Sequence, residues 1–364
     1  MKGKDTPPLR VLAVTPKGDL GGAERWLLAV GDATTRLQLN VVVLEEGPVV
    51  EQLESRGWPV WYRPTGRSVS GMWESYRWLG AIITEVAPDV ILLNGVKPGL
   101  LATPWAKRLK IPMVLVKHGT AFERSLAPLV ARASTGCIAV SDSHAVRLPA
   151  AKTRVIPPAR PASVESRLRE TDSGNLVVLM ATRLVPNKGV DTAIRSLEIA
   201  SQWRLLVAGA EDATAPDELS RLQDLALARN VADRVQFLGE VPSIVGLLHE
   251  VDAVAVLSRA DKHHPTPAEG FGMVVIEAAS AGIPVIADPI EVPSVAALHG
   301  DGVVEVVAAS PVSVARALAL LADRDVRLVL SQAGRQAASR HPSPEDVADQ
   351  VADVLATSVG GGRS

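Results

Sequence analysis

Short apolar runs rich in β-branched residues alternate with longer amphipathic stretches along nearly the whole chain of 364 residues. In the first half, the expected strands are Arg10–Thr15, Asn40–Leu44, Pro59–Tyr62, Asp89–Leu93, Met113–Lys117 and Cys137–Val140. In the second half, they are Leu176–Ala181, Arg204–Ala208, Val235–Leu238, Ala253–Leu257, Pro284–Ala287 and Val303–Val307. Strands that are apolar throughout and separated by helices are typical of parallel sheets covered on both faces. The alternation therefore predicts an α/β protein.

The stretches between these strands have the spacing of amphipathic helices. The expected helices include Ala23–Thr35, Met72–Val86, Gly189–Ser201, Glu218–Ala228, Met273–Ser280, Ser313–Ala322 and Arg327–Ser339.

The alternation stops between residues 157 and 174, where three prolines are followed by charged and small residues. Such a segment is typical of an interdomain connection. The sequence thus predicts a first domain at 1–158, a linker at 159–173, a second domain at 174–342 and a C-terminal segment at 343–364. That last segment contains a helix, Pro344–Ser358, which the family resemblance described below allows to pack back on the first domain. Ligands of doubly wound sheets bind beyond the carboxyl ends of the strands, so two facing domains of this kind would form a binding cleft.

Composition excludes several classes of protein. The net charge of −2 and the pI near 6.4 give no global attraction to nucleic acid, and none is expected as a partner. A single cysteine, Cys137, excludes a disulfide framework and a cysteine zinc cluster. The polar first nine residues lack the apolar core of a secretion signal, and no apolar run approaches the roughly 20 residues that span a bilayer. We therefore expect a cytoplasmic protein.

The segment from residue 267 to 279 carries two carboxylates eight residues apart. A proline and two glycines surround Glu269, which predicts that it lies on a loop, and Met273–Ser280 is expected to be a helix. The start of a helix presents free N–H groups and a partial positive charge, which suit a phosphate. Together with Glu269 and Glu277, these groups match what is needed to hold a sugar attached to a nucleotide diphosphate.

Two further loops follow predicted strands. Arg183 and Lys188 come after Leu176–Ala181, where two cations can neutralise a diphosphate, although a solvated loop is the alternative. Gly21 and Gly22 follow the first strand, where paired glycines let the backbone approach a phosphate closely, although an ordinary turn is the alternative. The chain lacks the G-x-G-x-x-G and G-x-x-x-x-G-K-[ST] motifs, which argues against a nicotinamide dehydrogenase and a P-loop NTPase.

Among the histidines, His118 is a candidate site residue, and none is expected to bind a metal. His118 directly follows the strand Met113–Lys117, so its side chain is expected to point into a cleft, with a structural role as the alternative. Ser141 or Ser143 is expected to cap the helix that begins near His144. The adjacent His263 and His264 would point apart on an extended loop with no clear third ligand nearby, so no metal site is predicted.

Aromatic residues cluster in the first domain, interleaved with Arg63, Arg67 and Arg77. The cluster consists of Trp58, Trp61, Tyr62, Trp73, Tyr76 and Trp78. It suits an acceptor platform or a peripheral contact with a membrane surface, and core packing is the alternative.

Taken together, these residues resemble those of the large retaining glycosyltransferase family of GT-B fold often called GT4, the glycosyl transferases group 1. The matching features are spread over nearly the whole length in the family's order. They are Gly21-Gly22 with Glu24, His118-Gly119, Ser141, Arg183 with Lys188-Gly189, and Glu269-Gly270-Phe271-Gly272-Met273 with Glu277. The pair of glutamates eight residues apart is the most specific of these features. The resemblance implies two Rossmann-like domains.

The resemblance also implies a role for each matching position in the second domain. Glu269 would contact hydroxyls of the donor sugar, Arg183 and Lys188 would stabilise the leaving diphosphate, and Glu277 would bind the ribose. Backbone N–H groups would hold the diphosphate and the sugar along the segment Gly270, Phe271, Gly272, Met273 and Val274.

In the first domain, the resemblance implies that Gly21 and Gly22 close over the phosphates. His118 would contact the donor sugar or lie beside the reacting carbon. Such enzymes need no metal or other cofactor, because their co-substrate is the nucleotide sugar. We expect the acceptor to be a small molecule, a glycan or a lipid-linked compound, and the oligomeric state to be a monomer or a homodimer.

Three departures from the family pattern affect the expected donor site. The linker has Pro157-Pro158-Ala159-Arg160 where Asn-Gly-Val is usual, and Thr182 replaces a glycine. Residues 288–294 lack the usual Gly-Gly-x-Pro-Glu run. The alternatives to a transferase are a GT-B nucleotide-sugar epimerase or hydrolase and a non-catalytic sugar-nucleotide binding module.

Overall fold

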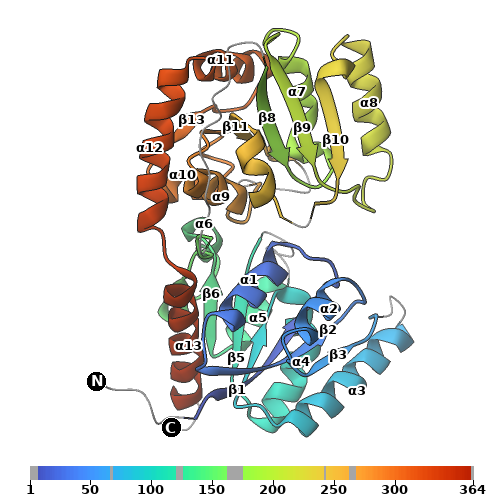
Figure 1. Ribbon diagram of the computed structural model, residues 1–364. Helices are drawn as coiled ribbons and strands as arrows, with labels where there is room; N and C mark the ends of the chain where they lie inside the picture. The colour runs from blue at the N-terminus through green and yellow to red at the C-terminus, as the bar shows by residue number, and fades with distance from the viewer. Residues whose placement is uncertain are drawn as a thin grey trace. The chain divides into compact units, whose positions relative to one another are not determined.

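The structure is a computed structural model that describes residues 7–65, 69–119, 126–161, 175–241, 243–261 and 268–361. Most of the predicted linker, together with Arg67, His263 and His264, lies outside these ranges. The chain divides into two compact units (Figure 1). The first comprises residues 1–159 and 342–364, and the second comprises residues 160–341.

The first unit contains a seven-stranded parallel sheet in the order β3-β2-β1-β4-β5-β6-β7. Its strands are β1 (Leu9–Thr15), β2 (Leu37–Val43), β3 (Val60–Tyr62), β4 (Val90–Leu93), β5 (Met113–Lys117), β6 (Gly136–Ala139) and β7 (Thr153–Val155). Its helices are α1 (Gly22–Asp32), α2 (Val49–Glu54), α3 (Val69–Val86), α4 (Val96–Leu109), α5 (Ala127–Ala133), α6 (Asp142–Ala145), the short η1 (Ala150–Lys152) and α13 (Pro344–Gly361). The strand order reverses direction between β1 and β4, and a doubly wound sheet binds ligands at such a point.

Alternate side chains of each strand enter two different cores. Val11 and Ala13 of β1 point to the face covered by α1 and α13, whereas Leu12 and Val14 point to the face covered by α3, α4 and α5. Both faces are covered by helices, so all four side chains are fully buried. This burial explains why the strand is apolar at every position.

The last helix, α13, belongs to the first unit although it follows the whole second unit in sequence (Figure 1). Its buried Val351 and Leu355 join the core beneath α1. On the exposed side of α13, Asp349 and Asp353 form ion pairs with Arg36 at 3.1 Å and 2.6 Å. The apolar contacts stabilise this docking most, because exposed ion pairs contribute little.

The second unit contains a six-stranded parallel sheet in the order β10-β9-β8-β11-β12-β13. Its strands are β8 (Leu176–Ala181), β9 (Trp203–Ala208), β10 (Val235–Gly239), β11 (Ala253–Val256), β12 (Val285–Ala287) and β13 (Val303–Glu305). The helices are α7 (Val190–Ser196), α8 (Glu218–Ala228), α9 (Met273–Ala281), α10 (Pro293–Ala297), α11 (Pro311–Leu321) and α12 (Arg324–Arg340), with the short η2 (Pro186–Lys188), η3 (Ala232–Arg234) and η4 (Val245–Glu250). In its core, the fully buried Trp203 donates from Nε1 to the carbonyl oxygen of Leu318 at 3.0 Å.

The predicted α/β class and both doubly wound parallel sheets are confirmed, and each predicted strand overlaps a strand of the structure. The prediction omitted β7, an edge strand of three residues that lacks the continuous apolar run of a central strand.

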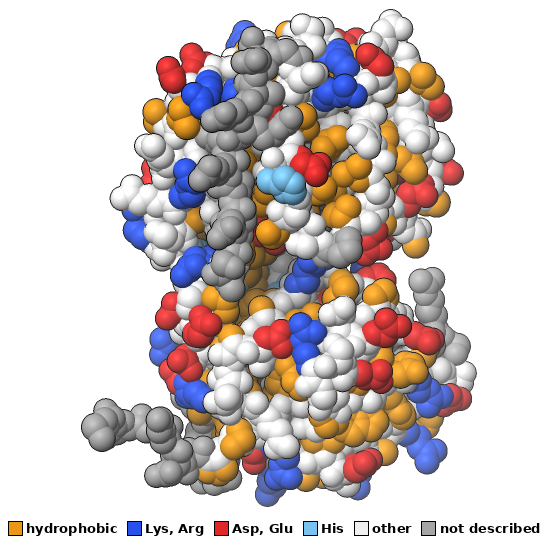
Figure 2. Space-filling model, viewed as in Figure 1, with side chains coloured by type: hydrophobic (Ala, Val, Ile, Leu, Met, Phe, Trp, Pro, Cys, Tyr) orange, Lys and Arg blue, Asp and Glu red, His pale blue; other side chains and the backbone are white. Residues whose placement is uncertain are grey.

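Most of the aromatic cluster packs inside the first unit. Trp61, Tyr76 and Trp78 pack against the core beneath α3, whereas Trp73 remains 61% exposed. Core packing therefore explains much of the cluster, and the proposed membrane contact stays a prediction. Within the described residues, no helix is long and apolar enough to cross a membrane. On the face drawn in Figure 2, basic and acidic side chains are interspersed over both units.

Candidate functional site

Lys188 and Glu269 meet at the carboxyl edge of the second sheet. The Lys188 Nζ atom donates to Glu269 Oε1 at 2.5 Å, and the hydroxyl of Ser258 donates to the same oxygen at 2.5 Å. Lys188 follows β8 and Ser258 follows β11, which are neighbouring strands. The side chains of Lys188 and Glu269 keep 12% and 19% of their surface exposed, so a ligand can reach both charges.

A glycine brings Lys188 to this position. Gly189 has a φ of +75°, and a Cβ atom there would lie 2.4 Å from the carbonyl oxygen of Leu257. The turn after η2 can therefore pack directly against the segment that follows β11. This close approach places Lys188 beside Ser258.

The loop that carries Glu269 is held by the segment following β12. The N–H of Ala268 donates to Glu291 Oε2 at 2.8 Å, and that of Glu269 donates to the Glu291 carbonyl at 3.0 Å. Ser294 donates from its N–H to the Phe271 carbonyl and from its hydroxyl to the Gly272 carbonyl, both at 2.9 Å. Residues 288–294, where the chain departs from the family pattern, thus position the candidate site.

Helix α9 begins next to this cluster. Its N-cap Gly272 has a φ of +92°, and no side chain caps the helix, so the N–H groups of Met273 and Val274 have no intrahelical partner. Phe271 is buried and packs against His341, with the two rings tilted and their centroids 5.6 Å apart. Its side chain is thus turned into the fold, and only its backbone is available to a ligand. Glu277 lies one turn further along α9 and is partly buried.

Arg183 lies at the same sheet edge but does not join Lys188 and Glu269 in the described part of the chain. Its exposed guanidinium pairs with Asp212. Burial alone would raise the pKa of Asp212, but hydrogen bonds from Thr214 and Arg183 outweigh it and lower that pKa to about 2. The Asp212 carboxylate therefore remains charged and retains Arg183.

In the first unit, the partly buried His118 ends a chain of hydrogen bonds through the buried Asn94, Thr15 and Glu24. His118 Nε2 lies 2.7 Å from Asn94 Oδ1, Asn94 Nδ2 donates to Thr15 Oγ1 at 3.1 Å, and Thr15 Oγ1 donates to Glu24 Oε1 at 2.9 Å. Burial and the nearby His144 lower the pKa of His118 to about 3. Burial raises the pKa of Glu24, an effect that the Thr15 hydrogen bond opposes. Asn94 and Thr15 are not among the site residues predicted from the sequence, although both lie at the carboxyl ends of strands.

The two glycines predicted to contact phosphate differ in their surroundings. Gly21 is the N-cap of α1, and a Cβ atom there would lie 2.9 Å from Glu24 Oε2. A Cβ atom at Gly22 would meet nothing within 4 Å. Gly21 therefore gives the Glu24 carboxylate room, whereas no steric contact requires a glycine at Gly22.

The prediction that Ser141 or Ser143 caps the helix at His144 is wrong. Ser141 occupies the N-cap position of α6, but no side chain caps this helix. The Ser141 hydroxyl instead lies 2.7 Å from His144 Nδ1. A buried imidazole nitrogen competes successfully for the hydroxyl because it would otherwise lose its hydrogen bonds to water.

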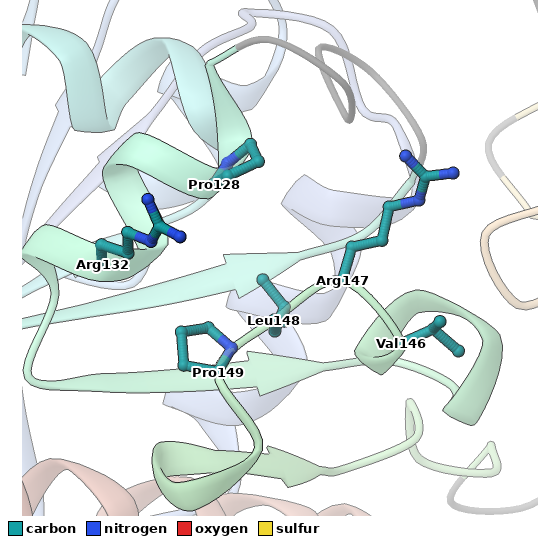
Figure 3. Close-up of a pocket in the computed structure, with 6 residues that line it drawn as sticks. All are labelled: Pro128, Arg132, Val146, Arg147, Leu148 and Pro149. Carbon is teal, nitrogen blue, oxygen red and sulfur yellow. The ribbon is translucent and has the colours of Figure 1, made fainter.

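A separate hollow of about 310 Å³ lies in the first unit (Figure 3). Figure 3 shows two arginines at its border, Arg132 on α5 and Arg147 after α6. Its lining residues are Pro128, Arg132, Val146, Arg147, Leu148 and Pro149. None of the site residues predicted from sequence lines it.

Two doubly wound units with charged and glycine-rich loops at the carboxyl edges of their sheets define a GT-B-type protein. The family model for glycosyltransferase family 4 matches residues 20–162, and the model for glycosyl transferases group 1 matches residues 165–337. The chain belongs to this glycosyltransferase family.

Relatives and solved structures agree with this assignment. The chain is 35% identical over 113 residues to a D-inositol 3-phosphate glycosyltransferase of Mycobacteroides abscessus, covering 30% of this chain and 24% of that protein. It is 31% identical over 200 residues to a GDP-mannose-dependent alpha-(1-6)-phosphatidylinositol monomannoside mannosyltransferase of Mycobacterium tuberculosis, covering 54% of this chain and 51% of that protein. The matches thus span about half or less of these relatives.

The fold is similar to that of Anabaena HepE in complex with UDP and glucose, with a TM-score of 0.83, 20% identity and coverage of 96% of this chain and 100% of that one. A sucrose-phosphate synthase from Thermosynechococcus elongatus gives a TM-score of 0.79 at 16% identity, covering 97% of this chain and 100% of that one. At these identities, the likeness concerns the fold.

Proposed function

We propose that the protein is a retaining glycosyltransferase that moves a hexose or an amino sugar from a nucleotide-diphosphate sugar to a hydroxyl acceptor without a metal ion. The observation that carries the proposal is the contact between Lys188 and Glu269 beside the start of α9. It combines a cation and backbone N–H groups for a diphosphate with a carboxylate for sugar hydroxyls. Family membership and the names of the relatives support the same reaction class.

The proposed chemistry follows from where charge develops. Breaking the sugar–phosphate bond builds negative charge on the diphosphate and positive charge on the sugar ring. Lys188 and the N–H groups of Met273 and Val274 stabilise the departing diphosphate more strongly in the transition state than in the ground state. Glu269 accepts hydrogen bonds from the sugar and has the charge that favours a positive ring. Glu277 binds the ribose hydroxyls.

The other residues predicted from the sequence have supporting roles in the proposal. Arg183 releases Asp212 and turns to the diphosphate when the donor binds. Gly21 and Gly22 approach the phosphates, and His118 contacts the donor sugar. The acceptor is a small molecule, a glycan or a lipid-linked compound. Inositol phosphates should be tested first, because one relative named above is a D-inositol 3-phosphate glycosyltransferase.

The first test is calorimetric titration of the protein with free UDP, GDP, ADP and dTDP in EDTA. We expect one nucleotide to bind without metal and Lys188→Ala to abolish or greatly weaken that binding. In turnover, loss of this cation should lower kcat by about 10²-fold. Arg229→Ala, which breaks the exposed pair with Glu198 in the same unit, is the matched control and should bind normally.

Binding of no nucleotide, or binding only with added metal, would overturn the proposed donor site. Once the donor is known, the anomeric configuration of the product, read from NMR coupling constants, tests retention. Consumption of the nucleotide sugar at the same rate with and without an acceptor would indicate a hydrolase or epimerase instead.

A further inference from the structure

In the hydrogen-bond chain from His118 to Glu24, each group donates to the next one. Asn94 Nδ2 donates to the Ala23 carbonyl oxygen at 3.1 Å as well as to Thr15. A carbonyl oxygen can only accept, so the NH₂ group of Asn94 must face Ala23 and its Oδ1 atom must face His118. The neighbouring main chain of α1 thus determines the orientation of this amide.

The orientation of Asn94 determines where the imidazole proton lies. Because Asn94 Oδ1 is an acceptor, His118 Nε2 must carry hydrogen to make the 2.7 Å contact. The ring is neutral at ordinary pH, since its pKa is lowered to about 3, so Nδ1 carries none. Within the described part of the chain, Nδ1 makes no hydrogen bond, and the ring is also held edge-on against Trp26 with centroids 5.2 Å apart.

Thr15 and Glu24 are the last two members of the hydrogen-bond chain that starts at His118. Thr15 accepts from Asn94, so its own hydrogen points to the Glu24 carboxyl group, which is 3% exposed. Each group donates towards Glu24, and a hydrogen-bond chain with a single direction resists reversal of any one member. Thr15 lies in β1, Asn94 directly follows β4, and Glu24 lies in α1. His118 is therefore held by groups from the place where the strand order of the first sheet reverses.

We propose that Glu24, Thr15 and Asn94 are positioning residues that hold His118 as the Nε2–H tautomer, so that Nδ1 acts as a hydrogen-bond acceptor for a hydroxyl group of the donor sugar. This inference rests on the proposed function for the identity of the ligand, but not for the tautomer. It adds a specificity rule: the donor must present a hydroxyl to His118. A sugar with a carboxylate at that position is rejected, because two acceptors face each other.

NMR of protein labelled with ¹⁵N-histidine tests the tautomer directly, and loss of one set of signals in His118→Gln assigns the ring. We expect Nε2 to have the shift of a protonated nitrogen and Nδ1 that of an unprotonated one at pH 7. In Asn94→Leu the amide oxygen is gone, and both tautomers should appear. Asn40→Leu, another largely buried asparagine of the same unit, should leave the His118 signals unchanged.

An Nδ1–H tautomer or a charged ring in the wild type would overturn the proposal, as would an unaltered Nε2–H tautomer in Asn94→Leu. For function, a nucleotide hexose that the protein accepts is compared with the matching nucleotide uronic acid. Asn94→Leu should lower kcat/KM for the hexose by about tenfold, while affinity for the free nucleotide diphosphate stays the same. Thr15→Ser should retain wild-type kcat/KM and Thr15→Val should not.

Different results would contradict the proposed donor site, the tautomer of His118 and the specificity for a donor hydroxyl. If no nucleotide binds, the donor site is wrong and the tautomer result still stands. If the wild-type tautomer is as expected but the uronic acid donor is used as well as the hexose, the specificity rule is wrong.

Discussion

The Lys188 ammonium and the Glu269 carboxylate lie 2.5 Å apart although 81 residues separate them in sequence. They meet because β8 and β11 are neighbours and because the loop before α9 is held by Glu291 and Ser294. The pair keeps opposite charges together without a ligand. A bound sugar diphosphate would replace this contact with separate partners for each charge.

Replacing Glu269 by glutamine removes the charge that faces Lys188. We expect the free nucleotide diphosphate to bind as well as before or more tightly, because a nearby anion no longer opposes it, while kcat falls by about 10²-fold. Ser258→Ala, which removes only one hydrogen bond to Glu269, should reduce kcat far less. Calorimetry and initial rates on the same preparations measure both quantities, and unchanged turnover in Glu269→Gln would contradict the role of Glu269.

Gly272→Ala is expected to destabilise the second unit. At a φ of +92°, an alanine Cβ atom would lie 2.6 Å from Val292 Cγ1 and 2.8 Å from Ser294 Oγ. Strain of this kind costs about 1–3 kcal/mol in the free energy of unfolding. Denaturant titration measures it, with Gly246→Ala as the control because a Cβ atom there meets nothing within 4 Å. Equal stability of the two variants would refute the argument.

Acid should destabilise the first unit through His118. In the unfolded chain this residue takes up a proton near pH 6.5, whereas burial keeps the folded ring neutral down to about pH 3. Between these values the unfolded state binds more protons, so the free energy of unfolding falls as pH is lowered. His118→Gln should lose stability less steeply between pH 7 and pH 5, by up to about 1.4 kcal/mol per pH unit. Parallel curves for the two proteins would show that His118 takes up its proton at the same pH in the folded and unfolded states, which would contradict the lowered pKa.

Leu355→Ala should weaken the first unit although the substitution lies near the chain's C-terminus. Leu355 is fully buried in the core beneath α1, and such a truncation costs about 2–5 kcal/mol. Asp353→Ala on the exposed side of α13 removes an ion pair with Arg36 and should cost less than about 1 kcal/mol. Thermal unfolding of the two variants compares these costs directly, and similar Tm values would mean that α13 adds little to the unit.

Local pattern was sufficient to predict the α/β class, the central strands and the loops that carry Lys188, Glu269 and His118. Apolar runs, glycines and prolines act within short windows, and the carboxyl ends of parallel strands must lie at one edge. The omitted strand, β7, has only three residues and lacks the continuous apolar run that marks a central strand.

The tertiary structure alone decided which partner each polar group has. Arg183 pairs with Asp212 rather than with Glu269. His118 is connected to Glu24 by hydrogen bonds through Asn94 and Thr15. Such choices depend on strand order and on close approaches between segments far apart in the chain. For the buried groups Asn94, Thr15 and Glu24 the partner is then fixed, because a polar group withdrawn from water must find its hydrogen bonds within the fold.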